Sequence, residues 1–406
     1  MHTGETIAAG LRAIPKASTQ AFASTQAAWR FYQNEAITLP NLFEPLMSEA
    51  HQGLESSSQQ YGLVMHDWSR ISYKNHDSKG DRLQMTHKHD IGYDLYSCLL
   101  VSDRDCVPIA PVNQTLSTGS GNLSNRYEGL QDTAIHLEEL TETMGALDQQ
   151  AFCKPLVHII DREGDSIAHQ RQWRDHHLLI RAKSRPRADY QGKTLALADI
   201  ADQLEYTLAR QVEAKGHRVT QWVGEADIVL ARPAKPKRKV NDTRTVLIKG
   251  DPLPVRLIVS RLISDEGDVV AEWLLLSNLK EVDASTLALW YYWRWKIETF
   301  FKLLKQAGHH LESWQQQCGE AVAKRLMIAS MACVLVWKLR RDETPEGEEF
   351  KHFLVRLSGR QMKRSRPITD SALLAGLWVF LSMQEVLNEY PSDKIQAWRD
   401  RMESPS

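Results

Sequence analysis

Long apolar runs are missing from this sequence of 406 residues. A transmembrane helix needs about 20 consecutive apolar residues, and no stretch approaches that length, so we expect no membrane span. The first residues, Met-His-Thr-Gly-Glu-Thr, lack the basic and apolar regions of a secretory signal peptide. We therefore expect a soluble, cytoplasmic protein.

Cysteine and familiar metal-binding patterns are also scarce. The five cysteines include no Cys-x-x-Cys pair, so we interpret them as free thiols in a reducing compartment. The 15 histidines show no His-x-x-x-His spacing and no Cys/His ligand pattern. These absences argue against a zinc site.

An excess of positive charge is absent as well. Lys and Arg number 50 against 51 Asp and Glu, and the net charge of −1 does not by itself indicate a nucleic-acid binder. The cations are clustered, however. The clusters are 232–244, with Lys237, Arg238 and Lys239; the alternating Arg181, Lys183, Arg185 and Arg187, which would share one face of a strand; and 356–366. A charge run is usually a solvated surface, but three such clusters favour a DNA-binding track.

The remaining composition is that of a globular protein, with 42% hydrophobic and 25% charged residues. Apolar runs predict three strands in a meander, followed by helix, strand, helix and strand. These strands are expected at 63–67, 93–102, 106–115, 156–161 and 177–182, and the helices at 130–147 and 166–175. The order indicates an α/β fold, a mixed sheet flanked by helices.

The length allows two or three domains. We expect a short helical N-terminal region at 1–60, a central α/β domain at 61–340 and a helical C-terminal region at 341–406. A β-rich insertion is expected at about 185–282. Its candidate strands are 218–223, 246–249, 255–263 and 269–277.

The segment 291–305 combines polar side chains of unusual variety. Offsets of 0, 3, 7 and 14 separate Tyr291, Arg294, Glu298 and Lys305. At about 100° per residue, they fall within an arc of roughly 60° on one helix. The opposite side would carry an apolar stripe of Trp293, Ile297, Phe300 and Leu304. A carboxylate suits a divalent metal, and the cations and the phenol suit phosphates, so the pattern favours chemistry on a nucleic-acid backbone. The alternative is a solvated helix face with an ordinary Arg294–Glu298 ion pair.

Two aspartates accompany the predicted strands. Asp67 lies in the first strand and Asp161 at the end of the fourth. If these strands are neighbours, the two carboxylates lie side by side, and Glu298 can reach them from a helix packed across the sheet. Crowded carboxylates repel unless a cation compensates, and two divalent metals about 3.5–4 Å apart would hold a phosphate for in-line attack. The alternative for Asp161 is an ordinary turn at the end of the strand.

These residues resemble those of bacterial insertion-sequence transposases, which have an Asp-Asp-Glu active site on a ribonuclease H-like fold. One branch of that family is marked by the motif Tyr-(2)-Arg-(3)-Glu-(6)-Lys, which is complete here from Tyr291 to Lys305. Asp67 and Asp161 match the two catalytic aspartates of the family. The resemblance covers roughly residues 25–340, including a basic strand at 181–184 and a strand with the base-stacking tryptophan, Trp273.

The resemblance implies a DNA transposase with a ribonuclease H-like fold that uses Mg²⁺, or Mn²⁺, held by Asp67, Asp161 and Glu298. Water would nick DNA at the element ends, and the freed 3′-hydroxyl would form a hairpin on the way to cut-and-paste insertion. The family works as a homodimer on DNA, with each subunit cutting in trans. DNA contacts are expected from Tyr291, Arg294, Lys305, Trp273, Trp295, Arg181, Lys183, Lys237, Arg238 and Lys239.

One departure from the family concerns the N-terminal region. Family members usually begin with a longer helical domain that reads the element end, and only its later part is recognisable here, around 28–34. The alternatives are therefore a catalytically impaired DNA-binding or inhibitory form, and a structure-selective DNA nuclease. The apolar segment 368–390 is expected either to dimerise, as the resemblance implies, or to dock on the core of its own chain.

Overall fold

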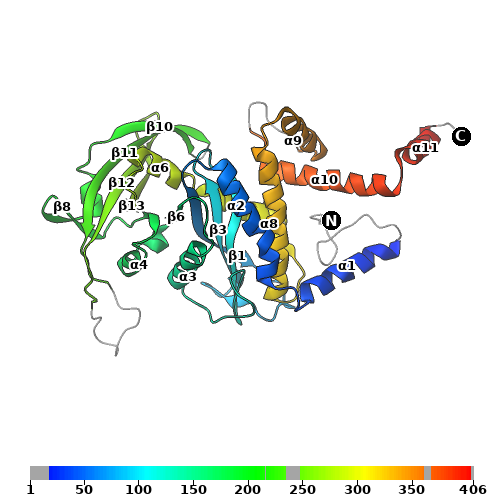
Figure 1. Ribbon diagram of the computed structural model, residues 1–406, viewed down its shortest axis with the longest axis horizontal. Coiled ribbons are helices and arrows are strands. Elements are labelled where there is room, and N and C mark those ends of the chain that lie inside the picture. The colour runs from blue at the N-terminus through cyan, green and yellow to red at the C-terminus, as the bar shows by residue number, and fades with distance from the viewer. Residues whose placement is uncertain (1–17, 215, 235–246, 361–366, 404–406) are drawn as a thin grey trace.

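A 13-stranded mixed sheet organises the computed structural model, which describes residues 18–214, 216–234, 247–360 and 367–403 (Figure 1). Its strand order is β5-β4-β3-β1-β6-β7-β13-β12-β11-β8-β9, with β2 paired to β3 and β10 paired to β11. Helices cover both faces of the half that begins at β5. The order and the flanking helices are those of a ribonuclease H-like α/β fold, as the sequence predicts.

The first half of the sheet contains the predicted meander and the two later strands. β1, β3 and β4 pair antiparallel, and β6 and β7 continue the sheet parallel to β1. Their bounds are Gly62–Ser72, Ile91–Ser102, Pro108–Thr118, Leu156–Ile160 and His177–Arg181. The two short strands β2 and β5 span Leu83–Gln84 and Gly121–Ser124. β3 and β4 are buried along most of their length, which explains why they appear in the sequence as continuous apolar runs instead of alternating ones.

The second half of the sheet extends from β7 through the β-rich insertion. β13 pairs antiparallel with β7, so the inserted strands continue the same sheet at the left of Figure 1. These strands are β8 Arg187–Tyr190, β9 Lys193–Ala196, β10 Thr207–Ala214, β11 His217–Leu230, β12 Leu253–Ile263 and β13 Val269–Ser277. The candidate strand at 246–249 begins outside the described residues, and within it Ile248 forms an isolated bridge with Ala234.

Helices pack on two sides of the sheet. On one side α3, His136–Asp148, covers a small core around Trp173, which directly follows α4, Ile167–Gln172. On the other side the larger core includes α6, Ala284–Tyr292, α7, Trp295–Lys302, and α8, Gly319–Arg341. The remaining helices are α1 Ser18–Gln33, α2 Leu39–Ser57, α5 Leu197–Ala201, α9 Pro345–Leu357, α10 Asp370–Glu389 and α11 Ser392–Glu403. Side-chain caps begin several of them; Asp283, for example, accepts a hydrogen bond from the Thr286 N–H at the start of α6.

The prediction of one regular helix over 291–305 is wrong. α6 ends at Tyr292, and α7 begins at Trp295. Between them the backbone tightens to i→i−3 hydrogen bonds, from Arg294 N–H to the Tyr291 carbonyl and from Ile297 N–H to the Arg294 carbonyl. A π-helical turn, Leu303–Ala307, follows α7. The segment 291–305 therefore consists of the end of α6, the helix α7 and a π-helical turn instead of one regular helix.

The prediction that the alternating cations of 181–187 lie on one strand is also wrong. β7 ends at Arg181, and β8 begins at Arg187. The intervening segment contains Pro186, which lacks the N–H that a sheet ladder needs. Arg181 and Arg187 therefore belong to two strands that are not neighbours in the sheet.

The C-terminal helix α10 is more apolar than we expected. Over Asp370–Asn388 it is long and apolar enough to cross a membrane by length and composition, contrary to the sequence-based expectation that no segment reaches that length. One such helix is weak support for a membrane span, because core helices of soluble proteins have the same composition. Ala372, Leu373 and Leu374 of α10 are fully buried in the protein. Together with α1 and α11, the rest of α10 projects from the right side of the body in Figure 1.

Candidate active site

The pairing of β1 with β6 brings the two predicted aspartates together. Residues 62–65 pair in parallel register with residues 156–159. Two residues further along both strand directions, the same register places Asp161 opposite Asp67. Because side chains alternate along a strand, both carboxylates point toward the same face of the sheet. Asp161 also caps the short helical turn after β6, since its Oδ1 accepts a hydrogen bond of 2.8 Å from the Glu163 N–H.

Glu298 reaches the same place through a shared arginine. Arg294 immediately precedes α7, and its Nη1 lies 2.8 Å from Asp67 Oδ2 while its Nη2 lies 2.6 Å from Glu298 Oε1. The Arg294 side chain is only 12% exposed. The predicted Arg294–Glu298 ion pair therefore exists, but the same guanidinium also holds Asp67 on a distant strand.

Burial strongly perturbs the first aspartate. It raises the pKa of Asp67 to about 6, and the nearby Asp161 carboxylate adds to the increase, whereas Arg294 and the Trp68 N–H act against it. A carboxyl group is thus kept in a site where its charged form is disfavoured. Such a group is typical of functional sites, because a cation that binds there gains from its ionisation.

The donor atoms suit a magnesium ion. Carboxylate oxygens are the ligands that Mg²⁺ prefers, and Asp67, Asp161 and Glu298 supply them from three elements of the core. Within the described part of the chain, no three His, Cys, Asp or Glu side chains are grouped to hold a metal ion. Arg294 instead bridges two of the three carboxylates. The three residues fit Mg²⁺ once the Arg294 guanidinium releases Asp67 and Glu298.

The helix pattern predicts that Tyr291 faces solvent, but the side chain is buried. It is 3% exposed at the end of α6, and its ring centroid lies 5.6 Å from that of Trp273. Burial raises the pKa of Tyr291, and the charges of Arg294 and Arg181 oppose the increase. The phenol therefore lies near the positive charges of both Arg294 and Arg181.

Lys305 lies on the π-helical turn, at the edge of the site. Its Nζ donates a hydrogen bond to the Arg70 carbonyl and lies 3.5 Å from Glu312 Oε1. Its side chain is 22% exposed. The ammonium is thus anchored beside β1, downstream of Asp67.

An aromatic cavity of about 610 Å³ adjoins α7. Its aromatic lining consists of Trp273, Tyr292, Trp293 and Trp295. Trp295 is 54% exposed, whereas Trp273 is 8% exposed and belongs to the core. The two tryptophans that are expected to contact DNA therefore line one space, Trp295 as an exposed ring and Trp273 as part of its wall.

The other predicted basic residues are only partly described. Arg181 is half-buried at the end of β7, and Lys183 is exposed just beyond it. Lys237, Arg238 and Lys239 lie outside the described residues. The segment that precedes them is fastened to the site, because Arg232 Nη2 lies 2.6 Å from Asp165 Oδ1 in the loop that follows Asp161.

Sequence reasoning missed a histidine that contacts the loop after Asp161. His136, at the start of α3, lies 2.8 Å from Glu163 Oε2 and 3.0 Å from Asp94 Oδ2. Its ring stacks on Trp68 with centroids 4.4 Å apart. The only signal in the sequence is Trp68 itself, an aromatic residue directly after Asp67, and nothing local connects it to His136.

We expect this histidine to make stability depend on pH. Burial alone would lower the pKa of His136, but Asp94 and Glu163 outweigh it and raise the pKa to about 9. A raised pKa stabilises the fold fully below the unfolded value of about 6.5, and this stabilisation is lost as the pH rises to about 9. The side chain is 42% exposed, so solvent screening limits the effect to about 1 kcal/mol. Chemical denaturation at a series of pH values measures it.

The His136→Gln variant should lose that pH dependence. His352→Gln, which changes an exposed histidine of α9, is the matched control and should keep it. An unchanged slope in the His136 variant would contradict the assignment of the charge to His136.

Comparison with known proteins identifies the family of this chain. Residues 59–335 match the family model of the transposase DDE domain, and this segment contains Asp67, Asp161 and Glu298. No curated protein matches the chain significantly. Because the family match covers well over half of the chain, this protein belongs to the DDE transposases of the insertion-sequence type.

Proposed function

We propose that this DNA transposase moves its element by cut-and-paste transposition, with Asp67, Asp161 and Glu298 as the catalytic carboxylates. One observation carries the proposal: the parallel register of β1 and β6 aligns Asp67 with Asp161, and Arg294 connects Asp67 to Glu298. DNA is the substrate of the family, and this geometry supports the proposal that three carboxylates from separate elements act on one phosphodiester.

In this proposal the three carboxylates would hold Mg²⁺. When bound, the ion supplies Lewis-acid stabilisation of the phosphate and makes water a better nucleophile at neutral pH. The chain itself orients the substrate. Arg294 exchanges its two carboxylates for phosphate oxygens, which a guanidinium binds in a forked geometry.

We propose that the remaining DNA contacts surround this centre. Lys305 and the exposed Lys183 would bind phosphates on either side of the cleavage point, and Trp295 would stack on a base. Arg181 and the buried Tyr291 would position Arg294. Tyr291 would also pack against Trp273 and fix its ring. Lys237, Arg238 and Lys239 remain proposed phosphate contacts from the segment that Arg232 fastens to the site.

Trp273 provides a test of the hairpin step. Because Trp273 belongs to the core, the Trp273→Ala substitution should lower the stability of the fold by about 3–5 kcal/mol. If a flipped base also stacks against it, hairpin formation should lose a further 1–3 kcal/mol or so relative to first-strand nicking. Both steps can be timed on labelled element-end DNA at a temperature where the variant is folded.

Leu274→Ala is the matched control, because Leu274 is 7% exposed and belongs to the separate core of the insertion. Equal losses of nicking and hairpin formation in the Trp273 variant would leave it with a packing role alone.

We propose a functional division of the chain that follows the predicted boundaries. Residues 1–60 would form part of a DNA-binding region, and 61–340 the catalytic domain with its insertion at about 185–282. Residues 341–406 would carry the dimer contact. We place the protein in the bacterial cytoplasm, associated with the nucleoid when it is bound to DNA.

The outer part of α10 tests the dimer. Four of its large apolar side chains are 38–47% exposed: Val379, Leu381, Met383 and Leu387. Replacing Leu381 and Leu387 with Glu should leave the protein monomeric with end DNA, because charges would be buried at the contact. Light scattering during size-exclusion chromatography, with and without end DNA, measures the mass.

Leu208→Glu, at a 55% exposed residue of β10, is the control and should preserve the dimer. An unaltered protein that remains monomeric with and without end DNA would rule the dimer out.

The decisive experiment for the proposed function uses DNA that carries the element's own ends. With Mg²⁺, the purified protein should nick the ends, form hairpins and join the excised ends to target DNA, and scrambled ends should not react. Nicking of both substrates without joining would indicate a structure-selective nuclease. Binding without cleavage would indicate an inhibitory form.

A further inference from the structure

The turn that follows β6 ends in a second aspartate, Asp165. Its side chain is 0% exposed, and both of its carboxylate oxygens have partners. Oδ1 lies 2.6 Å from Arg232 Nη2, and Oδ2 accepts a hydrogen bond of 2.8 Å from the Lys183 N–H. A carboxylate that is enclosed and paired in this way is not available to a metal ion or to a phosphate. Asp165 therefore has a different role from Asp161.

Asp165 joins segments that are distant in the sequence. Arg232 lies two residues beyond β11 of the insertion, and Lys183 lies two residues beyond β7. Arg232 is itself held by its backbone, because its carbonyl accepts a hydrogen bond of 2.9 Å from Arg171 Nη2 of α4. The Nε of Arg171 donates to the Asp251 carbonyl at 2.8 Å. The guanidinium of Arg232 is thus a fixed partner for Asp165.

The turn between Asp161 and Asp165 is compact. The Gly164 N–H donates to the Asp161 carbonyl at 3.1 Å, and the Glu163 N–H donates to the Asp161 carboxylate at 2.8 Å. A Cβ on Gly164 would lie 2.7 Å from Ile160 Cγ2, so the turn packs directly on the end of β6. Because Asp161 begins this turn and Asp165 ends it, a displacement of Asp165 also shifts Asp161.

We infer that Asp165 is a positioning residue for Asp161, and that Arg232 is the cation that holds Asp165 in place. The inference rests on the proposed function, since it assumes that Asp161 is a catalytic carboxylate. Residues that orient metal ligands without touching the metal change metal affinity or activity by about 10–100-fold when they are altered. Through this buried ion pair, the insertion contributes to the geometry of the carboxylate site.

Asp165→Asn tests the inference, because an amide has one acceptor oxygen where the carboxylate has two. That oxygen can accept from Arg232 or from the Lys183 N–H, and the amide NH₂ group then faces the other donor. Calorimetric titration of the full chain with Mg²⁺ should show at least about tenfold weaker binding. The Mg²⁺ concentration for half-maximal nicking should rise in parallel. Without metal, the backbone amides of 161–165 should exchange hydrogen faster than in the unaltered protein.

Two variants of Arg232 separate positioning by charge from packing. Arg232→Met removes the cation that holds Asp165, so it should weaken Mg²⁺ binding as Asp165→Asn does. Arg232→Lys keeps a cation within reach of Asp165 and should retain Mg²⁺ affinity within about threefold of the unaltered protein. Equal losses in the two variants would overturn the role given to the charge of Arg232.

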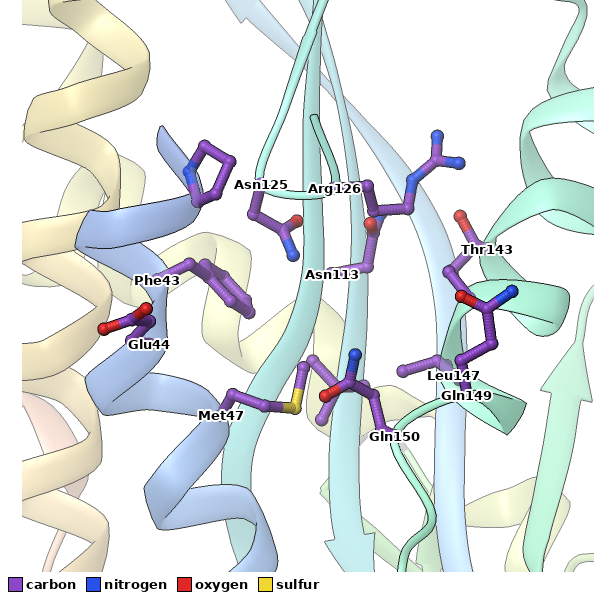
Figure 2. A pocket seen from close by; sticks show the side chains of 13 residues that line it. Phe43, Glu44, Met47, Asn113, Asn125, Arg126, Thr143, Leu147, Gln149 and Gln150 are labelled. Carbon is purple, nitrogen blue, oxygen red and sulfur yellow. The ribbon is translucent and has the colours of Figure 1, made fainter. Parts of the chain in front are cut away.

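Glu139→Gln is the matched control. Glu139 has a side chain that is 5% exposed, and it also accepts from an arginine, Arg126 at 2.5 Å, and from a second donor, the Thr115 hydroxyl at 2.7 Å. Arg126 lines a cavity of about 240 Å³ between α2 and α3 (Figure 2). Thr115 stands in the cross-strand row of Trp68, which projects from the face of the sheet opposite that of Asp67. The control should therefore lower Tm without changing Mg²⁺ affinity.

The outcomes distinguish this inference from the proposed function. If the unaltered protein nicks element-end DNA and Asp165→Asn keeps its Mg²⁺ affinity and Mg²⁺ requirement, the inference is overturned and the proposed function stands. If Glu139→Gln loses Mg²⁺ affinity as strongly as Asp165→Asn, the loss follows from general destabilisation, and the inference is overturned as well. If the unaltered protein neither binds Mg²⁺ nor nicks DNA, the proposed function fails and the inference fails with it.

Discussion

Glu298→Gln is expected to reduce nicking of element-end DNA by about a thousandfold, equivalent to about 4 kcal/mol of transition-state stabilisation. The amide keeps the size of the side chain and the oxygen that accepts from Arg294 Nη2 at 2.6 Å, so the fold should persist. What disappears is the negative charge that a divalent ion requires. Single-turnover cleavage of labelled DNA measures the loss, and thermal unfolding measures the fold.

Glu225→Gln is a matched control for this variant. Glu225 also pairs with an arginine at 2.6 Å, Arg256 on β12, and it is 49% exposed compared with 36% for Glu298. It should nick DNA at the unaltered rate. If Glu298→Gln retains nicking within about tenfold of the unaltered protein, Glu298 is not a catalytic carboxylate.

Arg294→Ala should move metal affinity and DNA cleavage in opposite directions. In the free protein, Arg294 neutralises Asp67 and Glu298 at 2.8 and 2.6 Å, where a metal ion would compete with it. Without metal, loss of a partly buried pair should cost about 3 kcal/mol of stability, since two crowded carboxylates remain. Added Mg²⁺ should bind at least about tenfold more tightly than to the unaltered protein and restore that stability. Cleavage should still fall, because the phosphate loses its forked donor.

Calorimetric titration with Mg²⁺ and thermal unfolding with and without the ion separate these effects. Arg256→Ala is the control, because Arg256 is equally shielded at 12% exposure but pairs with Glu225. It should lose stability without gaining affinity for Mg²⁺. Unchanged or weaker Mg²⁺ binding by Arg294→Ala would mean that the guanidinium does not compete for the metal position.

Several features of the fold follow from local patterns in the sequence. The apolar runs that become β1, β3, β4, β6 and β7 predict a mixed α/β sheet, because strands buried on both faces are continuously apolar. The apolar run of β6 stops at Ile160, and the carboxylate of Asp161 follows directly, as the sequence predicts. The motif spacing selects Arg294 and Glu298 as an i, i+4 pair, and the structure contains that pair.

Other features depend on contacts between distant segments. The spacing of Tyr291 and Arg294 assumes 3.6 residues per turn, but i→i−3 hydrogen bonds between α6 and α7 change the pitch. The spacing cannot reveal that Tyr291 is buried, with its ring centroid 5.6 Å from that of Trp273. The spacing also cannot reveal that Arg294 reaches Asp67 on β1. The alternation of basic residues at 181–187 likewise predicts a single strand, but the segment that contains Pro186 separates β7 from β8.

The sequence by itself therefore selects the candidate residues for the chemistry: two aspartates at predicted strands and a glutamate, an arginine and a lysine at helical spacing. Hydrophobic periodicity and short-range spacing are properties of neighbouring residues, so they can be read without knowing the fold. Only the tertiary structure decides which of these charges neutralise one another. The bridge from Arg294 to Asp67 and the ion pair of His136 with Glu163 both arise where strands and helices from distant parts of the chain pack together.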